Sequence, residues 1–459
     1  MPSPYPAALP EARAFLDSHP ETESFHLIFT DLCGVARGKV LRREEVMAAY
    51  ESGRFMPGSI MSIDVTGRDV EETGLVWGDG DADRIAWPVP GTLVPVPWVS
   101  GEPAAQFITT LHETDGQPAL TEPRQTLARV VKRFEPLGLT PVAAIELEFY
   151  LMDREAALAG RPRPPRALTN GARPEHFQAY LLQDIDDFAP FFTDMYAACK
   201  VQGLPARTLI AEYSPGQMEV VLKHRADALK ACDEAVMFKR LIRGVAERHG
   251  LLASFMAKPY SQFTGCGMHV HASLARADGS NAFSAPCAAE SPLMLHAIAG
   301  LQATMAGGMA FFAPNANSYR RFRRSSYAPV APTWGVNNRT VSIRVPAGSG
   351  ETMHLEHRPA GADANPYLVL AAVLAGMHYG ISETLDPGAP ITGNGYEQET
   401  PRMPTNWFDA LDALKASMVM ADYLDPRFVA HFALLKEVEA DRFFAVPTEL
   451  DFSWYLRTV

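Results

Sequence analysis

Four glutamates lie in two short segments whose spacing suits the binding of a divalent cation. Acidic and apolar residues alternate over residues 144–150, so Glu146 and Glu148 are predicted on one face of a β-strand. A Ser-Pro-Gly sequence at 214–216 predicts a turn that brings Glu212 and Glu219 together across a hairpin. Carboxylates this close repel each other, and a divalent cation would relieve the repulsion. Taken alone, each segment is better explained by an ordinary structural element: a strand with a solvated acidic face, and a plain polar hairpin.

A third segment, residues 265–274, adds imidazole side chains. His269, His271 and Ser273 occupy alternate positions and are predicted to share one face of a strand. Paired histidines at this spacing also occur in zinc sites and in purely structural roles, but no cysteine pair lies close in the sequence to complete a thiolate site. A site made mainly of glutamates with one imidazole favours Mg²⁺ or Mn²⁺, which prefer oxygen ligands.

Basic residues follow in three further segments. Residues 317–324 contain four arginines, for which a solvated charge run is the default explanation. Arg339 and Arg344 stand in an apolar, strand-like context, where a guanidinium is costly to bury unless an anion pairs with it. Carboxylates for a metal, combined with arginines for anions, are what phosphoryl transfer to a carboxylate substrate requires.

The elements that position these residues are also visible in the sequence. Short runs separated by turn residues between 25 and 111, with four prolines in 85–99, predict a small β-rich domain. Beyond it we expect a strand over 141–151 and a surface loop over 153–174. Helical spacing of apolar residues predicts helices that begin at the N-cap Thr121, cover 226–249, and begin near Asn365.

Composition limits the class of protein. The chain has 459 residues and a formal net charge of −12, which suggests two or three domains, or one large domain with an appendage, and argues against nucleic acid or an anionic membrane as a partner. Five scattered cysteines without a C-x-x-C pair indicate a reducing compartment. No signal-peptide pattern is visible, and the longest apolar stretch, about 367–377, is too short to span a bilayer. We therefore expect a cytoplasmic protein.

In their order along the chain, these segments resemble the glutamine synthetase superfamily over nearly the whole sequence. Neither a P-loop nor a strand-linked Gly-x-Gly-x-x-Gly is present to suggest another nucleotide-binding family. The resemblance rests on eight matching stretches: the Glu146-x-Glu148 strand, the 212–219 hairpin, Lys258-Pro259, 265–274, Asn317 to Arg321, Asn338 to Pro346, Glu356-x-Arg358 and 364–367.

The resemblance implies an α+β fold in two parts. After an N-terminal segment (1–24), a small β-grasp domain (25–112) would precede a large catalytic domain (113–459) with a curved antiparallel sheet and flanking helices. Members of the superfamily assemble as homo-oligomers, commonly dodecamers of two hexameric rings, and their active sites lie at subunit interfaces.

The resemblance also implies two or more Mg²⁺ or Mn²⁺ ions per active site. One ion, nearer the glutamate substrate, would be held by Glu148, Glu212 and Glu219. The other, at the nucleotide phosphates, would be held by Glu146, His269 and Glu356.

The remaining site residues are implied in the same way, with ATP as co-substrate. Glutamate would contact the side chains of Arg321 and Arg358 and the main chain of Gly265. ATP would contact His271, Ser273, Arg339 and Arg344, and the catalytic arginines would be Arg339 and Arg358.

In such enzymes ATP phosphorylates the γ-carboxylate of glutamate, and a nitrogen nucleophile then attacks the acyl phosphate. Ammonia-using members of the superfamily have a sequence similar to Phe-Asp-Gly-Ser-Ser in the N-terminal domain. They have a sequence similar to Gly-Tyr-Glu-Ala-Pro in a flap. This chain has no aspartate in the matching residues 55–60, and Tyr327 stands at the place of the flap glutamate. That pattern resembles the γ-glutamylpolyamine synthetase branch, in which an aromatic flap residue would line a pocket for a small organic amine such as putrescine.

Two alternatives stay open. The chain could be an ammonia-using glutamine synthetase with a divergent ammonium site, or a superfamily member without catalytic activity. Further acids could attract a cationic substrate, although a solvated face explains each of them better: Asp64, Asp69, Glu71, Glu72 and those in Glu399–Trp407.

Overall fold

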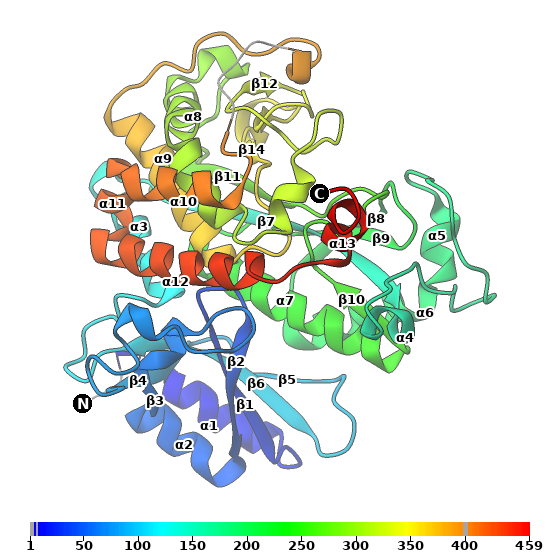
Figure 1. The fold of residues 1–459 in the computed structure, drawn as a ribbon. Helices are drawn as coiled ribbons and strands as arrows, with labels where there is room; N and C mark the ends of the chain where they lie inside the picture. The colour runs from blue at the N-terminus through cyan, green and yellow to red at the C-terminus, as the bar shows by residue number, and fades with distance from the viewer. Residues whose placement is uncertain (1–3, 6–7, 398–402) are drawn as a thin grey trace.

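Two β-sheets with helices packed around them make up the molecule (Figure 1). The computed structural model describes residues 4–5, 8–397 and 403–459, so residues 399–402 of the acidic segment named above lie outside the described residues. A six-stranded sheet comes from residues 24–112, and an eight-stranded sheet comes from residues 140–357. This arrangement confirms the predicted α+β class.

The six-stranded sheet has the order β2-β1-β6-β4-β3, with the short β5 paired to β6. Its two central strands β1 and β6 run parallel, and the other pairs are antiparallel. Helices α1 and α2 pack below it in Figure 1, which confirms the predicted β-grasp domain. Its elements are α1 (Ala8–Ser18), β1 (Ser24–Thr30), β2 (Ala36–Arg42), α2 (Arg43–Ser52), β3 (Arg54–Pro57), β4 (Asp83–Pro88), β5 (Val94–Pro95) and β6 (Ala104–His112).

Strand β6 is buried along its whole length because both of its faces are covered. Phe107 packs into the N-terminal core with Phe25 and Tyr50. The next residue, Ile108, points to the opposite face and packs into the main core of the molecule with Trp98. The small sheet is therefore attached to the rest of the chain by apolar packing. The division into 1–24, 25–112 and 113–459 remains our proposal.

The eight-stranded sheet has the order β12-β13-β14-β11-β7-β9-β8, and β10 pairs with β7. Its pairs are antiparallel, as expected for the catalytic sheet, except that β12 and β13 run parallel. The strands are β7 (Thr140–Asp153), β8 (Ala206–Ala211), β9 (Gln217–Leu222), β10 (Leu251–Ser254), β11 (Met268–Ala275), β12 (Trp334–Val336), β13 (Ile343–Val345) and β14 (Leu355–His357).

Helices flank this sheet, with α7 along β7 and β10 and with α8 packed against α9 (Figure 1). They are α3 (Pro123–Lys132), α4 (Arg154–Leu158), α5 (Leu182–Asp187), α6 (Ala189–Gln202), α7 (Ala228–Arg248), α8 (Pro292–Phe312), α9 (Pro366–Ser382), α10 (Trp407–Ala416), α11 (Met418–Leu424), α12 (Pro426–Phe444) and α13 (Glu449–Tyr455).

Side-chain caps set the ends of several helices, and they show that two predicted boundaries are wrong. The carboxylate of Glu122, not Thr121, caps α3 by accepting a hydrogen bond from the Gln125 N–H. Within the predicted loop 153–174, Asp153 caps the short helix α4. The predicted start near Asn365 is correct, because its side chain accepts from the Tyr367 N–H at the start of α9.

Helix α8 was not predicted, because it is apolar on all sides and has no amphipathic period. It is also longer than the stretch at 367–377 that the sequence suggested as the longest apolar run. By length and composition alone it would be able to cross a membrane. However, 67% of its most apolar window is buried inside the molecule against α9 and its neighbours. It is therefore a core helix.

Candidate active site

The register of strand β7 brings the predicted glutamates to a single face of the sheet. Glu146 lies opposite His269 on β11, and Glu148 lies opposite Glu219 on β9. The alternate residues of β7, such as Leu147, point into the main core. The strand period read from residues 144–150 is confirmed, and it directs the carboxylates away from the core.

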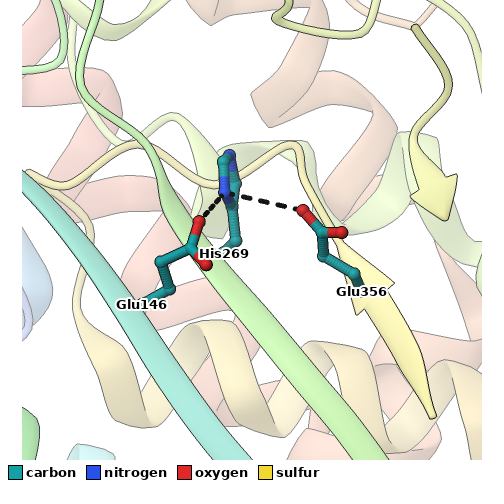
Figure 2. A group of neighbouring side chains, drawn as sticks. All are labelled: Glu146, His269 and Glu356. Atoms are coloured by element: carbon teal, nitrogen blue, oxygen red, sulfur yellow. Dashed lines mark hydrogen bonds and ion pairs between the residues drawn. The ribbon is translucent and has the colours of Figure 1, made fainter. Parts of the chain in front are cut away.

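Glu146, His269 and Glu356 form one compact group (Figure 2). The Nδ1 atom of His269 lies 2.5 Å from Oε1 of Glu146 and 3.7 Å from Oε1 of Glu356. One possible ligand atom from each of the three side chains lies within 4.8 Å of the others. His271 is adjacent, with its Nε2 atom 3.2 Å from the second oxygen of Glu146.

Glu146 also belongs to a second group, with Glu148 and Glu219, whose ligand atoms again lie within 4.8 Å of one another. Glu212 lies outside this group but close to it, and its side chain borders the same cavity. The hairpin predicted around Ser-Pro-Gly is confirmed, since β8 and β9 pair as antiparallel neighbours on either side of the turn. Gly216 in that turn has a φ of +75°, which favours glycine.

The carboxyl groups differ strongly in proton affinity. Burial, together with the charges of Glu146, Glu148 and Glu212, raises the pKa of Glu219 to about 11. Burial and the charges of Glu148 and Glu146 raise the pKa of Glu212 to about 7. Burial opposes ionisation of Glu146 too, but the charges and hydrogen bonds of His269 and His271 hold its pKa well below the usual value. Without a cation, the cluster therefore retains protons at neutral pH.

This donor set fits a pair of hard divalent cations. Buried carboxylates with one imidazole match the preference of Mg²⁺ and Mn²⁺ for oxygen ligands. The raised pKa of Glu219 reflects burial and repulsion from the neighbouring carboxylates. A bound cation would relieve this repulsion. Glu146 belongs to both groups, so it would be available as a ligand for either ion.

Glu356 is held by two arginines. Its Oε2 atom accepts a hydrogen bond from Arg344 at 2.7 Å, and its Oε1 atom accepts one from Arg358. Burial would raise the pKa of this carboxyl, but Arg358 and the histidines at 269 and 271 lower it to about 2. Glu356 is therefore an anion at any physiological pH.

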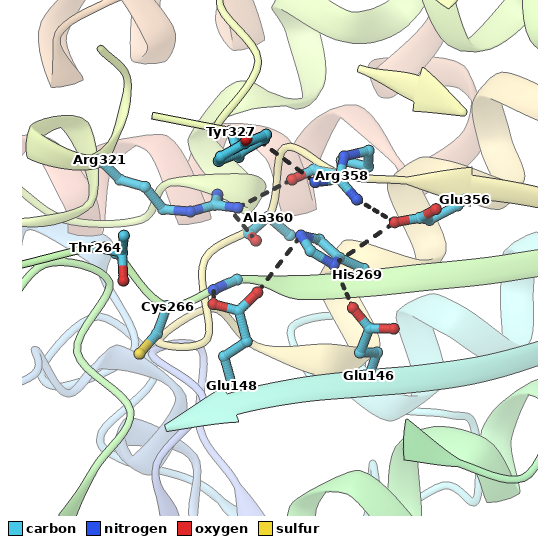
Figure 3. Close-up of polar contacts among 12 residues, drawn as sticks. Glu146, Glu148, Thr264, Cys266, His269, Arg321, Tyr327, Glu356, Arg358 and Ala360 are labelled. Atoms are coloured by element: carbon cyan, nitrogen blue, oxygen red, sulfur yellow. Dashed lines mark hydrogen bonds and ion pairs between the residues drawn. The ribbon is translucent and has the colours of Figure 1, made fainter. Parts of the chain in front are cut away.

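Arg321 is the one member of the Arg320–Arg324 run that is buried, with 6% of its surface exposed. Its guanidinium donates to the main-chain carbonyl of Pro359 at 2.7 Å. It also donates to the carbonyls of Arg358 and Ala360, each at 3.2 Å (Figure 3). Among the described residues, no carboxylate forms an ion pair with it, and it borders the cavity. A guanidinium fixed in this way is available to a carboxylate from a substrate.

Two features of the site were missed by sequence reasoning. The amide of Gln217 donates to Glu148 at 3.2 Å and to the Gly265 carbonyl at 2.9 Å, so it ties the hairpin to the loop before β11. The Gly267 N–H donates to Glu148 at 3.0 Å, and a Cβ atom at Gly267 would lie 2.7 Å from Nε2 of His269. Both residues lie inside quoted motifs, but their contacts depend on how distant segments meet.

The cavity has a volume of about 410 Å³, and three tyrosines contribute to its wall: Tyr180, Tyr213 and Tyr327. Each has about half or more of its surface exposed. Tyr180 and Tyr327 adopt left-handed backbone conformations, with φ of +61° and +57°. Such conformations cost free energy in a non-glycine residue and are concentrated at functional sites. Sequence reasoning named only Tyr327, because the loop containing Tyr180 has no periodicity.

Most of the residues named from the sequence border this cavity, but some do not. His271 and Ser273 do not border it; His271 contacts Glu146, and Ser273 lies on the same strand face further along β11. Arg339 does border it, but the strand predicted around Arg339 is wrong. There the Asn338 side chain accepts the Thr340 N–H at 2.9 Å and forms a turn, which leaves Arg339 exposed in the loop between β12 and β13.

The additional acids do not border this cavity within the part of the chain that the structure describes. Asp64 is buried and binds Arg442 at 2.8 Å. In one molecule they therefore supply no charge to the cavity wall.

Comparison with known proteins places this geometry in a family. Residues 120–455 match the family described as glutamine synthetase, catalytic domain. The chain is 38% identical to gamma-glutamylputrescine synthetase PuuA of Escherichia coli strain K12, over 97% of this chain and 94% of that protein. It is 32% identical to glutamate–isopropylamine ligase of a Pseudomonas species, over 93% of each chain.

A solved structure has the same fold over almost its whole length. It is described as apo GmaS without ligand, and it matches with a TM-score of 0.83 and 28% sequence identity. The match covers 97% of this chain and 99% of that one.

Proposed function

The chain belongs to the glutamine synthetase family and is an ATP-dependent ligase that forms carbon–nitrogen bonds; we propose that it joins glutamate to a small organic amine, such as putrescine, through γ-glutamyl phosphate. The observation that carries this proposal is the tyrosine wall of the cavity. Tyr327 stands where ammonia-using relatives would have an acid, and it is 58% exposed at the cavity.

An aromatic wall beside carboxylates suits a cationic alkylamine. The faces of Tyr180 and Tyr213 offer apolar area for a methylene chain and attract an ammonium group. Burial raises the pKa of Tyr180, and Glu212 and Glu219 contribute to the shift, so its hydroxyl lies within their electrostatic reach. A relative that takes putrescine and another that takes isopropylamine both support an organic acceptor.

Our proposal assigns metal binding and glutamate binding to separate groups of residues. Two divalent ions, held by the two carboxylate groups above, would neutralise the charge that develops on the transferred phosphoryl group. Arg321 and Arg358 would hold the glutamate carboxylate, with Gly265 contributing its main chain.

The nucleotide side is assigned to four residues in this proposal. The exposed Arg339 reaches the cavity mouth without an ion pair among the described residues, so its guanidinium is available to a phosphate. The ATP-side residues are His271, Ser273, Arg339 and Arg344.

We also propose a cytoplasmic homo-oligomer, with two stacked hexameric rings as in the family. Helix α13, near the C-terminus, is exposed along its whole length. Phe452, Trp454 and Leu456 are 54%, 58% and 72% exposed. An apolar segment of this size is usually covered in a working protein, and a second copy of the chain is our proposed cover.

The test is phosphate release from ATP and glutamate with a panel of acceptors: putrescine, spermidine, ethanolamine, isopropylamine and ammonium. We expect kcat/KM to be highest for one of the organic amines. Ammonium as the best acceptor would instead support the ammonia-using alternative. Failure of Mg²⁺ and ATP to raise the melting temperature would support a member without catalytic activity.

A further inference from the structure

A second and larger cavity, of about 700 Å³, lies between the N-terminal part of the chain and the catalytic sheet. It shares no bordering residue with the active-site cavity. Its walls come from residues 33–35 and 64–68 on one side, and from residues 252–256, 314–317 and 436–443 on the other. The wall contains five basic and three acidic side chains, so positive charge is in excess.

Lys239 on α7 is the central basic residue of this cavity. Only 5% of its surface is exposed, and its Nζ atom donates to the Ala364 carbonyl at 3.2 Å. Among the described residues, no carboxylate forms an ion pair with it. Burial, with a contribution from Arg243, lowers its pKa to about 7, and the negative charge of nearby Asp363 opposes this shift only in part. A buried ammonium without an anion is unfavourable, and a bound anion would compensate for that cost.

Arg243 lies one turn further along α7 and also borders the cavity. Its guanidinium lies 5.0 Å from the ring centroid of Phe255, and Nζ of Lys239 lies 5.5 Å from the same centroid. Within the described parts of the chain, Arg243 has no hydrogen bond or ion pair. Two cations four residues apart on a helix repel each other, so an anion between them would relieve the repulsion as well.

Two of the three acids of the cavity are paired with cations of their own. The third, Asp363, accepts hydrogen bonds only from neutral side chains, and its charge partly offsets that of Lys239, so positive charge is still in excess at Lys239 and Arg243. The partners of the three acids are at hydrogen-bonding distance: Arg442 at 2.8 Å from Asp64, Lys436 at 3.0 Å from Glu439, and Asn315 at 2.8 Å and Ser318 at 2.7 Å from Asp363.

Apolar side chains also line the cavity, with Val35, Leu252, Phe255 and Trp407 facing the same space. We propose that this cavity is a binding site for a small organic carboxylate, with its carboxylate at Lys239 and Arg243 and its apolar body against Phe255 and Trp407. Inorganic phosphate has the same oxyanion chemistry but no apolar part, so the two kinds of ligand can be distinguished. The proposal does not depend on which amine the enzyme accepts.

Calorimetric titration of the full-length protein tests the proposal, with benzoate, hexanoate and inorganic phosphate as probes. Saturating Mg²⁺, ADP and glutamate keep the active site filled throughout. We expect one benzoate or hexanoate to bind per chain, more tightly than phosphate, and to raise the melting temperature. Arg243→Gln and Lys239→Met should each weaken binding at least about tenfold.

Arg248→Gln is the matched control, because this arginine lies on the same helix and does not border the cavity. Within the described parts of the chain its side chain bonds only the Pro97 carbonyl. It should bind the probes as the unmodified protein does. Absence of saturable binding, or equal binding by Arg243→Gln, would overturn the site. Phosphate binding as tightly as the organic acids would overturn the assignment of an organic ligand. Because Arg243 is exposed, we expect the Arg243→Gln variant to fold. It therefore tests the site even if Lys239→Met does not fold.

Discussion

Glu219 lies directly opposite Glu148 in the antiparallel register of β9 and β7. Like charges at opposed positions destabilise a sheet, and here Glu219 is buried and the Glu148 side chain is only 12% exposed. The strain is evident in the pKa of Glu219, which burial and its carboxylate neighbours raise to about 11. The folded chain therefore creates a place where a proton or a divalent cation is needed.

Protons and a divalent cation should compete for the carboxylates of Glu212 and Glu219. Because Glu212 and Glu219 have raised pKa values without metal, bound Mg²⁺ must displace protons from them. We expect Mg²⁺ affinity to increase from about pH 6 to about pH 8, as Glu212 loses its proton more readily. Calorimetry in buffers of different ionisation enthalpy measures the released protons. Affinity independent of pH, with no proton release, would contradict this expectation.

The Glu219→Gln variant separates metal binding from folding. Glutamine resembles the protonated carboxyl that the metal-free protein has at neutral pH, so the metal-free melting temperature should change little. The increase in melting temperature caused by Mg²⁺ should be lost, and turnover should fall about a hundredfold or more. Glu247→Gln, on the exposed side of α7, is the control. Near-normal turnover of Glu219→Gln would remove Glu219 from the metal ligands.

Arg321→Lys tests recognition of the glutamate carboxylate. Lysine retains the charge but loses the planar fork that donates to several oxygens at once. We expect the KM for glutamate to rise about tenfold or more, while the KM for ATP changes less than about twofold. Arg320→Lys, at the exposed neighbour, should behave as the unmodified enzyme in steady-state assays. If both variants gave the same KM values, Arg321 would have no role in binding glutamate.

Tyr327→Glu tests selection of the acceptor. An added carboxylate at the cavity mouth would favour ammonium and remove apolar area from an alkylamine. The ratio of kcat/KM for putrescine to that for ammonium should fall about tenfold or more. Tyr327→Phe keeps the ring and should keep the ratio. A Glu variant with an unchanged ratio would show that Tyr327 does not select the amine.

Trp454→Asp tests the proposed role of α13 in assembly. A charge on the exposed apolar face should prevent its burial against a second chain. Light scattering after size exclusion should therefore report a smaller particle for this variant. Arg457→Gln changes charge in the same segment and should leave the particle size unchanged. Identical masses for Trp454→Asp and the unmodified protein would argue against α13 as a contact.

Local chemistry explains which features of the site could be predicted. The alternation that puts Glu146 and Glu148 on one face is a property of any strand, and the turn before Gln217 follows from Pro and Gly within four residues. The cap at Asn365 is local in the same sense. These features were correct because they depend on neighbours in the chain.

Helix α8 and the contacts of Arg321 could not be predicted from local sequence. Helix α8 has no polar face because other helices surround it, so no period marks it. Arg321 and Arg320 are the same residue type in the same run, and only the carbonyls of Pro359 and Ala360 select which one is buried.

The sequence by itself determined the chemistry that is available: glutamates on strands, imidazoles on a neighbouring strand, and arginines for anions. Only the tertiary structure decided the pairing of Glu219 with Glu148, the tyrosines that line the cavity, and the burial of Lys239 without an ion pair among the described residues. The physical reason is that proton affinity and desolvation depend on which distant segments meet, and a linear pattern does not specify those contacts.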